Sequence, residues 1–135
     1  MNEAEIITRV EKSFGPPSLQ SVLELRARHA AKSAAIAANV PLSSVYSKRR
    51  HYAPVLARHT AWWLLYNDGD LYSKSEIARL FKGHHSAVIH GLRRIETELE
   101  LDSRDRRVID RAKALYDAGD GRHDDATPVN TFDEE

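Results

Sequence analysis

The sequence predicts an all-α fold, a helical bundle, and three observations lead to this prediction. Apolar residues recur at helical spacing through most of the 135 residues, and no stretch alternates apolar and polar residues over a useful strand length. Residues 19–39 are rich in alanine, the best helix former. With 41% apolar residues, a chain of this length can build the core of about one domain.

The N-terminal residues 1–17 are expected to form a short helix or arm. Ile6, Ile7 and Val10 have helical spacing, and Gly15-Pro16-Pro17 ends the pattern. The segment carries acidic residues where a secretory signal would have an apolar core. Its role stays open, with packing on the domain or dimerisation as the alternatives.

The main domain is predicted to span residues 18–118 and to start with an N-cap at Ser18. One long helix, or two consecutive ones, is expected from Leu19 to about Asn39, with a packed face drawn from Val22, Leu23, Leu25, Ala30, Ala34 and Ala37. Val40-Pro41 should stop it.

A short helical turn is expected from Leu42 to Ser47, capped by Ser43 or Ser44, and the basic loop Lys48-Arg49-Arg50-His51-Tyr52 follows. Pro54 suits an early position of the next helix, which runs to Tyr66. Its tandem tryptophans Trp62 and Trp63 point about 100° apart on a helix, so we expect one in the core and one partly exposed. Asn67-Asp68-Gly69-Asp70 is predicted to be a turn.

Residues 73–100 have the layout of a helix-turn-helix motif. Ser73 and Glu76 form a capping box, and Ile77, Leu80 and Phe81 make an apolar stripe. Gly83 is expected to supply the sharp change of direction. The second helix starts His84-His85-Ser86-Ala87, with polar side chains at the end where recognition helices meet base edges. Val88, Leu92, Ile95 and Leu99 form its buried stripe.

A last helix is predicted from about Arg104 to Ala118, capped within Leu101-Asp102-Ser103 and ended by Gly119. Its apolar stripe consists of Val108, Ile109, Ala112, Leu115 and Tyr116. Residues 119–135 are acidic and poor in core-forming side chains, so we expect a disordered tail.

The formal net charge of zero hides a basic block in the middle of the chain. Residues 26–94 contain twelve basic and three acidic side chains, a net charge of +9, whereas residues 95–135 carry −7 and residues 1–25 carry −2. The basic block coincides with the helix-turn-helix. This overlap is the electrostatic footprint of a protein that binds a polyanion.

The segment SSVYSKRRHYAPVLARHTAWWLL…SKSEIARLFKGHHSAVIHGLRRIE resembles the C-terminal DNA-binding domain of the bacterial replication initiator DnaA. The resemblance covers about residues 28–101. It rests on three features. The first is a short helix before a Lys-Arg-Arg loop. The others are residues 73–77, which are similar to the family's LPEI helix start, and residues 84–91, which are similar to its recognition-helix sequence DHTTVLHA. It implies a Trp-repressor-like helix-turn-helix that binds a short duplex site, with the recognition helix in the major groove and an arginine in the adjacent minor groove.

The resemblance also implies roles for individual residues. Arg58 is similar in position to the family's minor-groove arginine, and His85 and Ser86 match its base-reading His-Thr pair. The full set that we expect to contact DNA is Lys48, Arg49, Arg50, Arg58, Ser73, Lys74, Lys82, His84, His85, Ser86, Ala87, His90 and Arg94. Arg79 and Arg93 are further candidates for phosphate contacts.

Two departures from the family pattern predict a shifted target site. Where the family has GGRDHTTV this chain has KGHHSAV, with His84 in place of an aspartate and Ala87 in place of a threonine. Each good base contact contributes about 1–3 kcal/mol of discrimination, so two changes are enough to remove the preference for the DNA sequence that the family usually binds. No GxxxxGK[ST] loop is present, and we expect no ATP-driven assembly from this chain.

The predicted function is therefore sequence-specific binding of double-stranded DNA, as a transcriptional regulator or a replication-control accessory. The alternative is a protein–protein adaptor that keeps the fold, with the replication or transcription machinery as its partner. We expect no enzyme, cofactor, metal site or membrane segment, a cytoplasmic, nucleoid-associated location, and a monomer or homodimer. The absence of cysteine removes thiol catalysis and disulfides, and His85 and His90 are five residues apart, a poor spacing for metal ligands.

Overall fold

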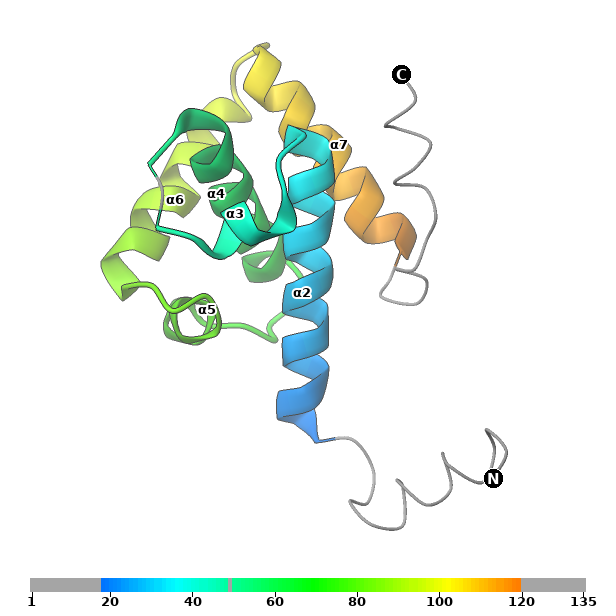
Figure 1. Ribbon diagram of the computed structural model, residues 1–135, viewed down its shortest axis with the longest axis vertical. Helices are drawn as coiled ribbons and strands as arrows, with labels where there is room; N and C mark the ends of the chain where they lie inside the picture. The colour runs from blue at the N-terminus through cyan, green and yellow to red at the C-terminus, as the bar shows by residue number, and fades with distance from the viewer. Residues whose placement is uncertain (1–17, 49, 120–135) are drawn as a thin grey trace.

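A computed structural model describes residues 18–48 and 50–119, and the described residues form six helices without a strand (Figure 1). The helices are α2 (Leu19–Ala38), α3 (Leu42–Tyr46), α4 (Tyr52–Tyr66), α5 (Lys74–Leu80), α6 (His85–Glu98) and α7 (Arg104–Gly119). The all-α prediction is confirmed. The expectations for residues 1–17, Arg49 and residues 120–135 lie outside the described residues.

Helix α4 is the centre of the bundle and contacts each of the other five described helices. In Figure 1, α2 and α7 lie on one side of it and α5 and α6 on the other. Its buried residues include Trp62 and Leu65, while Trp63 is only partly buried, so one of the tandem tryptophans is in the core and the other is not, as predicted. This arrangement places the α5–α6 motif at the surface, supported from behind by α4.

Helix α2 packs closely against the bundle because its inner face is built mainly from alanine. Ala30, Ala31 and Ala34 are completely buried, and Leu23 is 3% exposed. Small side chains let two helix backbones approach each other, and the facing α4 also contributes Ala57 and Ala61. The helix begins as predicted, since the Ser18 hydroxyl accepts a hydrogen bond from the Ser21 amide.

Two predicted packing positions on α2 are wrong. Val22 is 40% and Leu25 is 55% exposed, because the inner face runs through Leu23 and Ala27 instead. In Figure 1 the N-terminal half of α2 extends beyond the other helices. The predicted serine cap of α3 is also wrong, since Pro41 occupies the N-cap position and no side chain caps the helix.

Helix α7 closes the bundle against α2 and α4. Ile109, Ala112 and Tyr116 are buried, as the predicted stripe requires. The Ser103 hydroxyl accepts a hydrogen bond from the Arg106 amide and so caps the helix. Ile109 joins Ile95 of α6 and Leu56 of α4 in a second small cluster, which attaches the C-terminal half of α6 to α7.

Candidate nucleic-acid interface

The turn between α5 and α6 is formed by Lys82 rather than by the glycine that follows it. Lys82 has the left-handed φ of 55°, and Gly83 has no positive φ. The Gly83 amide donates to the Ala78 carbonyl at 2.8 Å and the Lys82 amide donates to the Arg79 carbonyl at 3.2 Å. This pair of bonds is a Schellman motif, which ends α5 and turns the chain sharply. The conformational role expected for Gly83 is thus a wrong prediction.

The exposed face of α6 carries the residues expected to read bases. His84, His85, Ser86, Ala87 and His90 are all exposed. On the opposite face, Val88, Leu92 and Ile95 are buried against the bundle. Because α6 has no acidic residue in its first turn, its N-terminal amides present an uncompensated positive end to the solvent.

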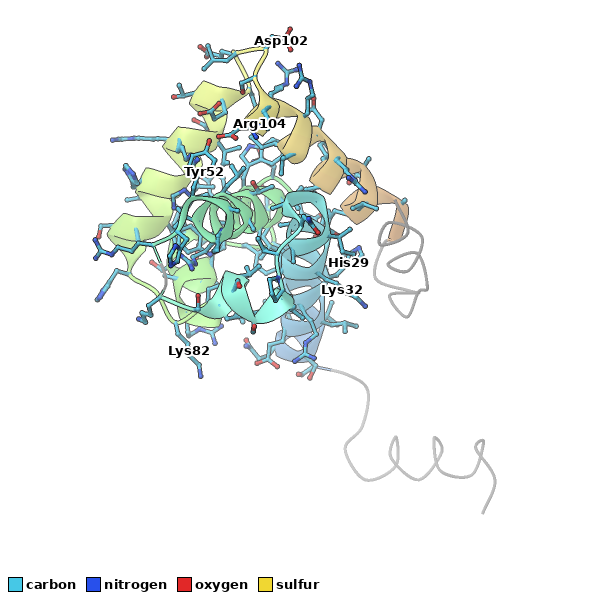
Figure 2. All side chains as sticks on the ribbon, turned by 45° about the horizontal axis from the view of Figure 1, so that its top comes forward. His29, Lys32, Tyr52, Lys82, Asp102 and Arg104 are labelled. Carbon is cyan, nitrogen blue, oxygen red and sulfur yellow. The ribbon has the colours of Figure 1, made fainter. Side chains whose placement is uncertain are left out.

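The basic loop joins this surface through a contact between the two segments. The Lys48 Nζ donates to the backbone carbonyl of Lys82 at 3.2 Å. Lys48, Arg50 and Lys82 are exposed, and Figure 2 shows the Lys82 side chain pointing away from the bundle. The loop after α3 and the turn before α6 therefore form one continuous basic surface.

The start of α5 supplies two more predicted contacts. The exposed Ser73 caps the helix by accepting the Glu76 amide at 3.1 Å. Lys74 lies over the Tyr66 ring, with its Nζ 5.4 Å from the ring centroid, and is half-buried. The hydroxyl of Ser73 is thus used within the fold, whereas the ammonium of Lys74 remains at the surface.

Arg58 is held inside the fold, although it was expected to reach the minor groove. Its Nε donates to the Val45 carbonyl at 3.0 Å and its Nη2 to the Ser44 carbonyl at 3.1 Å. Burial lowers the pKa of the half-buried guanidinium. Arg58 therefore ties the end of α3 to α4, and a contact with DNA would have to replace these bonds.

Arg94 also points into the fold, at the junction of three helices. Its Nη2 is 3.4 Å from Asp105 Oδ2, and its guanidinium lies over the Tyr52 ring at 5.2 Å. The Tyr52 hydroxyl donates to the same Asp105 oxygen, which raises the pKa of Tyr52. Asp105 is 7% exposed, so this buried carboxylate joins Arg94 of α6 to Tyr52 at the start of α4. In this structure Arg94 has a partner other than a phosphate.

His59 is a buried imidazole directly behind α6. Burial lowers its pKa to about 4, and the charges of Arg94 and His90 act in the same direction. It packs against the Trp62 ring at 5.3 Å and meets the His90 ring edge-on at 6.0 Å. At neutral pH His59 is therefore a neutral core residue that supports the recognition helix.

The described residues contain neither a cluster of metal-ligating side chains nor a membrane-spanning helix. Within residues 18–48 and 50–119, no group of three or more His, Asp or Glu side chains is placed to hold a metal ion. In the same part of the chain, no helix is long and apolar enough to span a bilayer.

Comparison with known families identifies the motif built by α5 and α6. Residues 30–95 match the family model for the bacterial dnaA protein helix-turn-helix. This segment therefore carries a DNA-binding helix-turn-helix of the DnaA C-terminal type. This is a DNA-binding and not a catalytic family. No solved structure matches the chain.

The internal contacts of the site were the part that sequence reasoning missed. Asp105 gave no signal beyond an acidic residue in the first turn of a helix, which is a common helix-dipole position. Tyr52 was predicted only as the last residue of the basic loop 48–52, and its contact with Asp105 was not foreseen. Neither pattern indicates which arginine the carboxylate binds, because the partners lie 11 and 53 residues away in the chain.

Proposed function

We propose that this chain binds double-stranded DNA in a sequence-specific way, as a transcriptional regulator or a replication-control accessory. The single observation that carries the proposal is the Lys48–Lys82 contact, which joins the basic loop to the helix-turn-helix. Loop and motif then present one surface, with polar residues at the start of α6 for base edges and lysines beside them for phosphates. The family match supports DNA as the partner.

Within this proposal the exposed residues have distinct roles. His85 and Ser86 read base edges from the first turn of α6, and the methyl group of Ala87 contacts thymine. Lys48, Arg50 and Lys82 contact phosphates, as does Lys74 at the start of α5. Such a protein acts in the cytoplasm at the nucleoid, and the domain that does so spans residues 18–118.

The test is selection of bound duplexes from a random library at near-physiological salt, followed by sequencing. We expect a compact motif that differs from the family's usual box, because His84 and Ala87 depart from the family pattern. His85→Ala and Ser86→Ala should change the preferred bases. Lys48→Ala and Lys82→Ala should weaken the binding of all duplexes alike. Each should reduce the magnitude of the slope of the logarithm of the binding constant against the logarithm of the salt concentration by about 0.9.

The matched control is Arg107→Ala on α7, which removes an exposed cation away from this surface. It should leave the motif and the salt slope nearly unchanged. If no motif is enriched and the wild-type chain binds all duplexes alike, sequence-specific recognition is refuted. If it binds no duplex at all, the protein-adaptor function takes its place.

A further inference from the structure

A groove that shares only Lys82 with the basic surface of Lys48, Arg50 and Lys82 lies between α2, α3 and α5. It is open to solvent and has a volume of about 610 Å³. Its apolar part includes Tyr46 and Phe81, whose rings stack at 5.1 Å with an interplanar angle of 12°. Tyr46 is 40% exposed while Phe81 is buried, so one aromatic face remains available to a ligand.

The edges of the groove are basic. Arg28 of α2, Arg79 of α5 and Lys82 of the turn line it, with Glu24 as the one acidic residue of the lining. Arg79 also lies 3.9 Å from the Glu76 carboxylate beside the groove. Arg28 is close enough to Tyr46 for its charge to oppose the rise in the tyrosine's pKa that burial causes. An aromatic surface bordered by three cations suits a short acidic peptide that carries an aromatic residue.

The chain itself contains such a peptide. Residues 131–135 read Thr-Phe-Asp-Glu-Glu, with Phe132 followed by three carboxylates. Phe132 is the only aromatic residue after Tyr116. The segment therefore offers one ring for the Tyr46 face and three acids for the three cations.

The end of α7 lies against α2, across that helix from the groove (Figure 1). A Cβ on Gly119 would come within 2.7 Å of His29 Nε2, so α7 ends against α2 one residue from Arg28. The twelve residues 120–131 reach about 40 Å when fully extended, and a helix is only about 10 Å across. A tether of this length corresponds to an effective concentration in the millimolar range, so even weak docking is populated.

We propose that residues 131–135 dock in the groove between α2, α3 and α5, with Phe132 against Tyr46 and the acidic residues beside Arg28, Arg79 and Lys82. This inference goes beyond the proposed function and does not depend on it. If the chain also binds DNA, docking neutralises Lys82 and so competes with phosphate contacts.

The absence of cysteine from the chain makes a direct test possible. A nitroxide attached to Asn130→Cys in the full-length protein should broaden the amide resonances of Arg28, Tyr46 and Lys82. Phe132→Ala and Arg28→Glu, each in the labelled chain, should remove most of this broadening. Arg107→Glu changes the net charge of the chain equally but on α7, and should preserve it.

Three results would overturn the proposal. The first is broadening that avoids the groove or spreads evenly over the basic surface, including α6. The second is broadening at the groove that Arg28→Glu and Arg107→Glu reduce equally, which would reflect net charge alone. The third is perturbation of Arg28 and Tyr46 by added duplex in the Phe132→Ala chain as strongly as in the wild type, which would make the groove a DNA contact.

Discussion

Gly91 permits the close contact between the recognition helix and α4, and replacing it tests the packing of the whole site. A Cβ at this position would lie 2.8 Å from His59 Cδ2 and 2.9 Å from Trp62 Cε3, about half an ångström closer than ordinary contact. Both rings are buried, at 8% and 3% exposure, and neither is the end of a long side chain that can move away. Alanine would thus force α6 away from α4.

Two opposing effects determine the size of the change. Alanine in a helix interior is favoured over glycine by about 1 kcal/mol. Overpacking of a well-filled core costs about 1–3 kcal/mol. With two rigid rings in the way we expect the upper part of that range, so Gly91→Ala should lower the free energy of unfolding by about 1–2 kcal/mol. For a domain of this size, each kcal/mol corresponds to roughly 4–8 °C in Tm.

The measurement is urea and thermal unfolding followed by circular dichroism, with Gly83→Ala as the control. A Cβ on Gly83 would meet only Trp62 Cζ2, at 4.0 Å, and its φ is not positive. Gly83→Ala should leave stability unchanged or raise it by up to about 1 kcal/mol. Equal or greater stability of Gly91→Ala relative to the wild type would refute the packing argument.

Three further predictions follow from the contacts around α6. Lys82→Gly should raise the free energy of unfolding in urea by up to about 1 kcal/mol, because glycine adopts a φ of 55° without strain. Lys82→Ala should not raise it, and a gain in stability for the alanine variant would contradict the assignment of Lys82 to the turn. Asp105→Ala should lower the free energy of unfolding by about 2–4 kcal/mol, because Arg94, whose side chain is 20% exposed, loses its carboxylate partner. Asp110→Ala removes an ion pair whose side chains are 40% and 58% exposed, and it should lower the free energy of unfolding by at most about 0.5 kcal/mol. Equal losses in the two variants would contradict the stabilising role of Asp105. His59 has a pKa of about 4 when folded and about 6.5 when unfolded, so between these values the unfolded chain binds more protons, and stability should fall by up to about 3 kcal/mol as the pH drops from 6.5 to 4. His59→Gln should flatten this part of the pH–stability curve, and an unchanged slope would mean that His59 does not carry it.

Most of the helices, and the exposed face of α6, follow from the sequence because both are local. An α-helix has a fixed period, so the spacing of Val88, Leu92 and Ile95 already determines that His85 and Ser86 lie on the opposite side. The caps at Ser18 and Ser73 are local in the same sense, because a cap bonds within three residues of itself.

The tertiary structure decided the partners of the long side chains and the detail of the packing. DNA contacts of Arg58 and Arg94 stay predictions, but the structure shows that Arg58 donates to the Val45 and Ser44 carbonyls and that Arg94 pairs with Asp105 of another helix. The sequence also did not determine that Val22 and Leu25 would stay exposed. Helical spacing predicts an apolar stripe but not which of two adjacent stripes a neighbouring helix will cover.

The sequence by itself determined the all-α fold, the helix-turn-helix and its polar outer face, because each depends on the periodicity of neighbouring residues. Only the tertiary structure decided that Lys82 forms the turn, that Asp105 joins α6 to the start of α4, and that a basic groove lies beside the motif. These features depend on residues brought together from distant parts of the chain, and no local pattern encodes such distances.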